Sequence, residues 1–305
     1  MKLVTFRKNG SFARIGVVQQ DIVYDVTDIV AEMQPQPAGE HQSQWFEQLS
    51  ATSMLRLLAC GQAGMEKLKI SLKNSQRSLV QHALESVKLQ APVVRPGKII
   101  GVGKNYADHA VEVGSAKLPA PKLFSKFPSV VVGPNSQVHA KSIIKKMDYE
   151  AELAVVIGKF ASQVKAEDAL DVVAGYTVLN DLSAREFQHD VPQAQTSFAK
   201  SMDGFCPMGP WLVTADEIPD PQELDVSLYL NGERMQHGNT AQMIFPVRIL
   251  IEYITQYVEL EPGDVIATGT PAGVGSARKP PVWLKAGDQI RIAISQIGTL
   301  EHGIC

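Results

Sequence analysis

Two glutamates, Glu150 and Glu152, stand two residues apart at the start of an apolar run that ends at Gly158. Because side chains alternate across a β-strand, both carboxylates would point to the same face. Two carboxylates beside a buried strand repel each other and lose solvation, so the pair favours a cation between them. The sequence therefore predicts a metal site here. A strand that begins at the surface with two solvated glutamates is the alternative that spacing alone leaves open.

Asp181 offers a third oxygen ligand. It follows a predicted strand over residues 176–179, and a side chain at a strand end is well placed to meet Glu150 and Glu152. Three carboxylates without a cysteine or histidine cluster form a hard-oxygen set, which suits Mg²⁺ or Mn²⁺ better than zinc or copper. Such a site would keep open positions for substrate and water. A turn or helix-cap residue is the alternative role for Asp181.

His109 and Glu112 are three residues apart in a segment that is predicted to enter a short helix. Residues at this spacing lie on the same helix face and can touch. A histidine paired with a carboxylate can hold and deprotonate a water molecule. A solvated helix face is the alternative for this pair, because histidine is common on exposed helices.

Three further side chains could bind an anion. Lys200 lies among apolar and small residues, where its ammonium group could face an anionic substrate. Arg185 and Gln188, one helical turn apart after Asp181, are donors that could orient a carboxylate. Exposed surface positions are the alternative for all three. The glycine-rich loop 268–275 could also cradle an anion through its backbone N–H groups, but it lacks the lysine and the following helix of a nucleotide-binding P-loop.

The elements that must position these residues fall into two regions. Residues 1–28 alternate apolar and polar types as short antiparallel strands do, and residues 45–89 show a helical pattern. A proline-containing link follows at 91–97, where the chain is expected to be extended. We therefore predict an N-terminal α+β domain over residues 1–90.

Residues 91–305 read as many short strands with sharp turns and few helices. Asn231-Gly232 between two apolar segments is a two-residue hairpin signal, and Pro246 stands where an amphipathic helix would begin. There is no regular alternation of strand and helix, so the pattern favours an α+β fold over a doubly wound parallel sheet.

Composition narrows the functional classes. The 305 residues are 45% hydrophobic and carry a formal net charge of −3, with a sequence pI of about 6.2. No basic run points to nucleic acid, and no apolar run reaches the roughly 18 residues of a membrane span. Small acidic substrates remain open. The three cysteines have no paired spacing, which favours a reducing cytoplasm and no disulfide framework.

Six motifs in a fixed order from about Lys98 to Ala277 together resemble the fumarylacetoacetate hydrolase superfamily. The similarity is greatest to the members called fumarylacetoacetate-hydrolase-domain-containing proteins and to those that resemble ureidoglycolate lyases. The first 90 residues match only loosely. The motifs are Gly103–Tyr106 with His109 and Glu112, Tyr149–Glu152, Asn180-Asp181, Ala199–Pro210, Asn231–Glu233 and Gly263–Gly275.

This resemblance implies a β-rich mixed-sheet roll over residues 91–305 and a homodimer. It also implies Mg²⁺ or Mn²⁺ (with Ca²⁺ as a substitute in crystals) held by Glu150, Glu152 and Asp181. Further implied roles are a water-activating dyad of His109 and Glu112, charge stabilisation by Lys200, and substrate contacts from Tyr106, Arg185, Gln188 and Thr270. Family members often carry an apolar residue where this chain has Lys104. A positive charge beside the dyad would alter substrate choice, unless the lysine side chain points away from it.

The chemistry that unites these residues is the stabilisation of an enolate. A 2-oxo acid can chelate a metal ion through its carboxylate and keto oxygens while a C–C bond or a C–H bond breaks. The sequence favours hydrolysis of an acylpyruvate-type substrate, because the His109–Glu112 dyad and Lys200 occur together. Tautomerisation or decarboxylation of oxaloacetate shares the same intermediate and is the alternative. A ureidoglycolate lyase and a metal-binding dimer without catalysis rank below both. Which 2-oxo acid is the substrate stays open.

Overall fold

The run that starts at Glu150 forms strand β11 (Ala151–Ile157), in which all seven residues are buried. It lies between β12 (Val173–Asn180) and β17 (Val265–Ala267). Strands that are covered on both faces are continuously apolar rather than alternating, which accounts for the unbroken run after Glu152. The computed structural model describes residues 1–305 except 9, 36–38, 76–77, 113 and 115–117.

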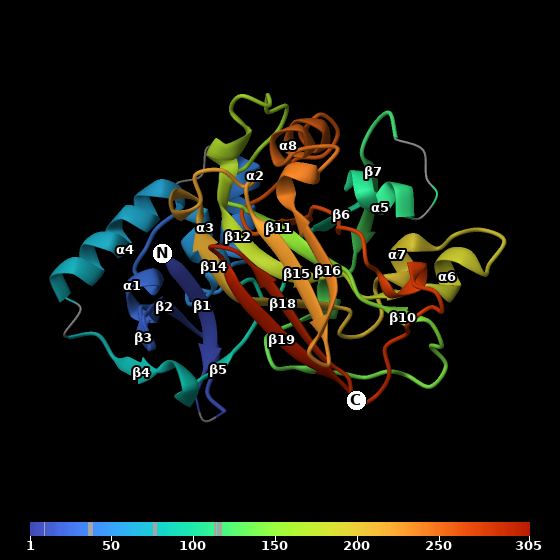
Figure 1. Ribbon diagram of the computed structural model, residues 1–305. Helices are drawn as coiled ribbons and strands as arrows, with labels where there is room; N and C mark the ends of the chain where they lie inside the picture. Colours follow the sequence, from blue (N-terminus) through green and yellow to red (C-terminus); the bar gives the residue numbers. More distant parts are fainter. Residues whose placement is uncertain (9, 36–38, 76–77, 113, 115–117) are drawn as a thin grey trace.

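One large mixed sheet holds these strands (Figure 1). Its order is β4-β3-β2-β1-β14-β12-β11-β17-β6-β7, with β5 beside β1 and β8 beside β14. Most neighbours are antiparallel, whereas β17 pairs parallel with β6 and β14 pairs parallel with β8. The remaining strands are β1 (Lys2–Arg7), β2 (Arg14–Gln19), β3 (Ile22–Asp25), β4 (Gln81–Ala83), β5 (Lys88–Leu89), β6 (Ile99–Gly103), β7 (Lys122–Lys126), β8 (Val131–Val132) and β14 (Cys206–Thr214).

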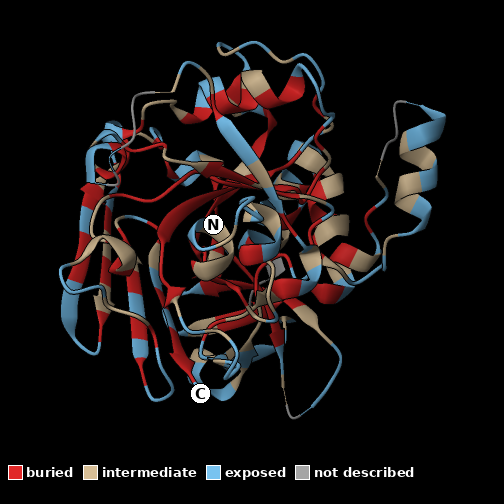
Figure 2. Ribbon diagram, turned by 90° about the vertical axis from the view of Figure 1, so that its right-hand side faces the viewer, coloured by how far each residue is buried: buried red, intermediate tan, exposed pale blue. Residues whose placement is uncertain are grey.

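A second sheet in the order β16-β15-β18-β19-β9 packs across the first, and a shared apolar core joins Val155 to Leu228 and Ile292. The predicted hairpin is confirmed: Asn231 and Gly232 have φ values of 51° and 87°, as a type I′ turn requires. Figure 2 shows that buried residues are concentrated in the strands. The strands are β9 (Gln137–Val138), β15 (Asp225–Leu230), β16 (Glu233–Asn239), β18 (Gln289–Ile294) and β19 (Gly298–Ile304).

The N-terminal strands extend the large sheet, because β1 pairs with β14 through Lys2↔Val213 and Leu3↔Leu212. The helices there are α1 (Thr27–Ala31), α2 (Glu40–Glu47), α3 (Met54–Ala59) and α4 (Gly61–Ser75). The predicted antiparallel strands of residues 1–28 are confirmed. The helical assignment was wrong for 81–89, which form β4, a 3₁₀ turn and β5, because pairing with β3 and β1 overrides the local pattern. The division into domains at residue 90 stays a prediction.

Short elements gather at one side of the sheet (Figure 1). They are α5 (Ala107–Glu112), α6 (Glu186–His189), α7 (Thr196–Ala199) and the paired strands β10 (Met147–Asp148) and β13 (Ser183–Ala184). The helix predicted after Pro246 is α8 (Val247–Thr255). The architecture is the mixed α+β arrangement that the sequence predicts. Among the described helices, none is both long and apolar enough to cross a membrane.

Gly175 tests the close approach of β12 and β14. A Cβ added there would lie 2.1 Å from the carbonyl oxygen of Val213. Gly175→Ala would therefore push the backbones of β12 and β14 apart and should lower the free energy of unfolding by about 1–3 kcal/mol. Gly103→Ala is the matched control, because its Cβ would meet atoms only at 3.7–3.9 Å. Urea unfolding of both variants measures this difference, and equal midpoints would contradict the packing described.

Candidate active site

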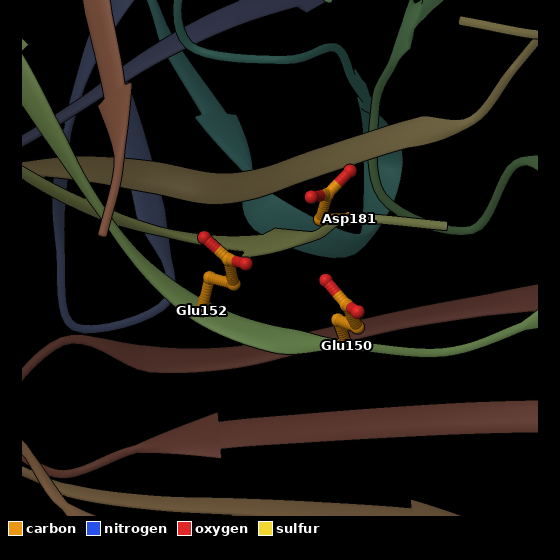
Figure 3. Close-up of side chains that lie close together, drawn as sticks. All are labelled: Glu150, Glu152 and Asp181. Carbon is orange, nitrogen blue, oxygen red and sulfur yellow. The ribbon is translucent and has the colours of Figure 1, made fainter. Parts of the chain in front are cut away.

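Three carboxylates converge at the junction of β11 and β12. Ligand atoms of Glu150, Glu152 and Asp181 lie within 4.8 Å of one another, and all three residues are buried (Figure 3). Antiparallel pairing sets this geometry, because Ala151 pairs with Asn180 and the Asp181 amide donates to the Glu150 carbonyl oxygen over 2.9 Å. The start of one strand thus lies beside the end of the other. The alternative of solvated glutamates on a surface strand does not hold.

Two buried lysines hold two of these carboxylates. The Lys200 ammonium group donates to Glu150 Oε2 over 2.7 Å, to Asp181 Oδ2 over 2.6 Å and to Ser183 Oγ over 2.8 Å. The Lys126 ammonium group donates to Asp181 Oδ1 over 2.6 Å and to the Lys200 carbonyl oxygen. Both lysines are therefore part of the carboxylate cluster, and the solvated alternative for Lys200 is excluded.

Arg185 connects the cluster to a fourth carboxylate. Its guanidinium group donates to Asp148 Oδ2 over 2.8 Å, to Glu150 Oε1 over 2.6 Å and to Gln188 Oε1 over 2.9 Å. Asp148 also accepts the backbone N–H groups of Gly275 and Ser276 over 2.7 Å and 3.0 Å. Arg185 is thereby fixed, and it positions both Glu150 and the Gln188 amide.

The electrostatics of the two glutamates differ. Burial would raise the pKa of Glu150, but the charges of Lys200, Arg185 and His109 hold that pKa below its usual range. Burial, together with the charges of Asp181 and Glu150, raises the pKa of Glu152 well above its usual range. Glu152 accepts the Gly269 amide over 2.8 Å and forms no ion pair with a described residue. Its negative charge lacks compensation.

A divalent cation fits this site. The three ligands are all carboxylate oxygens, which suit a hard ion, and a positive charge would compensate Glu152. The Tyr106 hydroxyl is fully buried and has no hydrogen-bond partner among the described residues. Burial raises the pKa of Tyr106, and the charge of Glu152 adds to this rise. A solvated ion could supply the partner that this hydroxyl lacks.

The predicted dyad is assembled on α5. His109 Nδ1 and Glu112 Oε2 lie 3.1 Å apart, and Glu112 Oε1 accepts the Gly273 amide over 2.9 Å. His109 is buried, so the solvated helix face is excluded for it. The second contact fixes the Glu112 carboxylate, which in turn orients the imidazole ring.

The loop predicted to cradle an anion binds the protein's own carboxylates. The amides of Gly269, Gly273 and Gly275 donate to Glu152, Glu112 and Asp148 respectively. The same loop carries Thr270, whose hydroxyl accepts from Gln236 Nε2 over 2.8 Å. Gln236 Oε1 also accepts the Ala151 amide over 2.9 Å. This loop therefore ties the dyad, the carboxylates and β11 together.

A cavity of about 570 Å³ brings most of the predicted residues to one surface. Asp181 and Tyr106 are fully buried and are not among the residues that line it. Both therefore contribute through their neighbours and not through the cavity lining. The predicted residues that line the cavity are His109, Glu112, Glu150, Glu152, Arg185, Gln188, Lys200 and Thr270.

Sequence reasoning missed several supporting residues. Asp148 precedes Glu150 by two residues, so the alternation that singled out Glu150 could also have found it. Lys126 ends β7, and its neighbours Phe124 and Phe127 are the one local signal for it. Asn180 belongs to the Asn180-Asp181 motif, but nothing local predicts its contacts or its partner His302: Asn180 Oδ1 accepts the Glu150 amide over 3.0 Å, and its amide group lies 2.8 Å from His302 Nε2.

Comparisons with known proteins find similar sequences. Residues 98–305 match the family described as Fumarylacetoacetate (FAA) hydrolase C-terminal. The human mitochondrial oxaloacetate tautomerase FAHD2A is 46% identical over 72% of this chain and 69% of its own length. The oxaloacetate tautomerase YisK of Bacillus subtilis is 45% identical over 76% and 77%.

Two solved structures cover almost all of both chains. A fumarylacetoacetate hydrolase from Exiguobacterium antarcticum has a TM-score of 0.80 with 35% identity, over 100% of this chain and 99% of its own. A maleylpyruvate hydrolase from Sphingobium, in complex with manganese(II) and pyruvate, has a TM-score of 0.76 with 33% identity, over 100% and 98%.

The uncompensated Glu152 generates a metal-binding prediction. Mg²⁺ at about 100 times its dissociation constant should raise the free energy of unfolding by about 2.7 kcal/mol. Glu152→Gln should abolish most of this gain, because it removes one ligand and its charge. Asp190→Asn, which removes an exposed carboxylate paired with Lys146, should keep it. Thermal unfolding with and without Mg²⁺ measures the effect, and an undiminished gain in Glu152→Gln would disprove the assigned ligand.

His302 generates a pH prediction. Burial lowers its pKa from 6.5 to about 4, so the unfolded chain binds the extra proton first as the pH falls. Neutral His302 should therefore contribute up to about 3 kcal/mol above pH 6.5, lost progressively as the pH falls toward 4. His302→Gln keeps an acceptor for Asn180 and should weaken this acid sensitivity. Urea midpoints between pH 7 and 4 compare the two proteins; parallel curves would contradict the assignment.

Proposed function

The chain belongs to the fumarylacetoacetate hydrolase family, and from that premise we propose that it catalyses keto–enol tautomerisation of a 2-oxo acid of the oxaloacetate type. The observation that carries the proposal is one cavity lined by both the glutamate pair and the His109–Glu112 dyad. The named tautomerases among its relatives support the choice of reaction. A 2-oxo acid is a suitable substrate, because its head offers two oxygens to a cation.

Glu150, Glu152 and Asp181 are proposed to hold Mg²⁺ or Mn²⁺. The bound ion would supply positive charge that binds the carboxylate and keto oxygens of the substrate and disperses the charge of an enolate. The manganese in the Sphingobium relative supports this proposal. The remaining steps belong to the side chains of this protein.

His109 is the proposed proton carrier. Glu112 accepts a hydrogen bond from Nδ1–H, which leaves Nε2 as the basic nitrogen. In the enol-to-keto direction Nε2 of the neutral imidazole takes the enol O–H proton, and the imidazolium then gives this proton to C3 of the substrate as the C=O bond forms. One proton moves from oxygen to carbon and the histidine ends neutral, so a single histidine is sufficient.

The other cavity residues are proposed to bind and orient the substrate. Lys200 presents an ammonium group beside Glu150 and Asp181 and would stabilise charge that develops on the enolate oxygen. Gln188, which is fixed by Arg185, and Thr270 are proposed to donate to the carboxylate head. Tyr106 would bond a water behind the glutamates.

Hydrolysis of an acylpyruvate is the second candidate. One specific observation favours it: the dyad could equally hold a water molecule for attack on a carbonyl group, as the maleylpyruvate hydrolase relative suggests. The two reactions share the enolate and differ in what the dyad holds. A homodimer and a cytoplasmic location stay predictions from the sequence.

The dyad is tested by Glu112→Gln. The loss of the carboxylate removes the acceptor that orients His109, so kcat for oxaloacetate tautomerisation should fall by about 10²–10⁴ while Mg²⁺ affinity stays unchanged. Asp108→Asn alters a carboxylate on the same helix that accepts the His109 backbone N–H and should keep most activity. Loss of the enol absorbance measures turnover.

The same assay separates the two candidates. Magnesium-dependent tautomerisation of oxaloacetate without cleavage of acylpyruvates supports the first, and cleavage of acylpyruvates alone supports the second. Full activity of Glu112→Gln with either substrate would contradict the role of the dyad in both.

A further inference from the structure

Lys104 lines the cavity and has an unusual backbone conformation. It directly follows β6 and has a positive φ of 59°, a conformation that side chains other than glycine seldom adopt. The next residue, Asn105, is fully buried: its side chain donates to the Thr268 carbonyl oxygen over 2.8 Å and accepts the Phe245 amide over 2.9 Å. These bonds fix the residue that follows Lys104, and Lys104 itself lines the cavity.

Lys122 lies beside it on the neighbouring strand. Strand β7 pairs antiparallel with β6 through Gly103↔Lys122. A Cβ added at Gly103 would lie 3.8–3.9 Å from the Lys122 Cδ and Cγ atoms, so the aliphatic stem of this lysine passes over the glycine toward the cavity, which it also lines. Lys104 and Lys122 therefore line the same cavity from the end of β6 and the start of β7.

Neither lysine has a partner within the described part of the chain. Lys126, Lys200 and Arg185 all form buried ion pairs with carboxylates, whereas no ion pair or side-chain hydrogen bond joins Lys104 or Lys122 to a described residue. Both lysines therefore offer the cavity a positive charge that no described carboxylate neutralises. An anion bound in the cavity would be attracted to both.

The charge of the whole site favours a dianion. Four cationic side chains line the cavity, and there are four carboxylates when the buried Asp181 is included. These charges cancel, so a bound divalent ion would give the site a net charge of about +2. The cations are Lys104, Lys122, Arg185 and Lys200, and the carboxylates are Glu112, Glu150, Glu152 and Asp181.

We propose that Lys104 and Lys122 bind a second carboxylate of the substrate, so that the site selects 2-oxo dicarboxylic acids over 2-oxo acids with an uncharged end. The inference rests on the proposed function, because the carboxylate at the 2-oxo end must occupy the glutamate pair. The substrate then spans the cavity, with its two ends bound by different cations.

Binding of unreactive probes tests this assignment without turnover. L-Malate and 2-hydroxybutanoate share one end and differ only in a distal carboxylate against a methyl group. Calorimetry on the full chain with Mg²⁺ should give tighter binding of malate. Lys104→Met and Lys122→Met should each weaken malate binding about threefold to tenfold, in line with a half-exposed ion pair, and leave 2-hydroxybutanoate binding within twofold.

Lys165→Met is the control, because it removes the same charge from an exposed lysine that does not line the cavity. Its affinity for malate should equal that of the unaltered protein. Equal binding of the two probes by the unaltered protein, or equal losses for both probes in the lysine variants, would overturn the inference.

The kinetic arm separates this inference from the proposed function. Oxaloacetate and 2-oxobutanoate form a matched reactive pair, and Lys104→Met should raise KM for the first with little change in kcat. Preference for malate without any tautomerase activity would refute the function while leaving the carboxylate contact in place. Tautomerase activity with no effect of either lysine on malate binding would refute the contact alone.

Discussion

The structure depends on positive groups that compensate the negative charges brought close together inside the protein by the backbone. The junction of β11 and β12 fixes Glu150, Glu152 and Asp181 within 4.8 Å of one another. Buried like charges are unstable unless cations meet them. Lys126 forms an ion pair with Asp181, and Lys200 forms one with Glu150. Glu152 is left with one amide hydrogen bond, and that residual charge is what a divalent ion would compensate.

The fold supplies the rigidity that this arrangement requires. The two sheets enclose β11 and β12, so the ligands cannot separate without opening the core. The loop at 268–275 adds a second constraint, because its amides hold Glu112, Glu152 and Asp148 at once. The dyad and the carboxylates are thereby fixed relative to each other by a single segment, as positioned catalytic groups require.

The sequence predicted those parts that follow from local periodicity. Alternation identified Glu150 and Glu152, helical spacing identified His109 and Glu112, and the Asn-Gly signal identified a hairpin. Features that depend on distant pairing escaped. Residues 81–89 become strands only because β3 and β1 accept them. His302 reaches Asn180 across 122 positions, so this contact could not be predicted from spacing.

The most direct test of the account is the number of protons released when the ion binds. Burial, together with the charges of Asp181 and Glu150, raises the pKa of Glu152, so this group holds its proton more tightly than a free carboxylic acid, whereas a metal ligand must be deprotonated. Calorimetry of Mg²⁺ binding in buffers of different ionisation enthalpy measures the protons that are released. The account predicts that the unaltered protein releases more protons per ion than Glu152→Gln. Tight binding without proton release, or no binding at all, would contradict it.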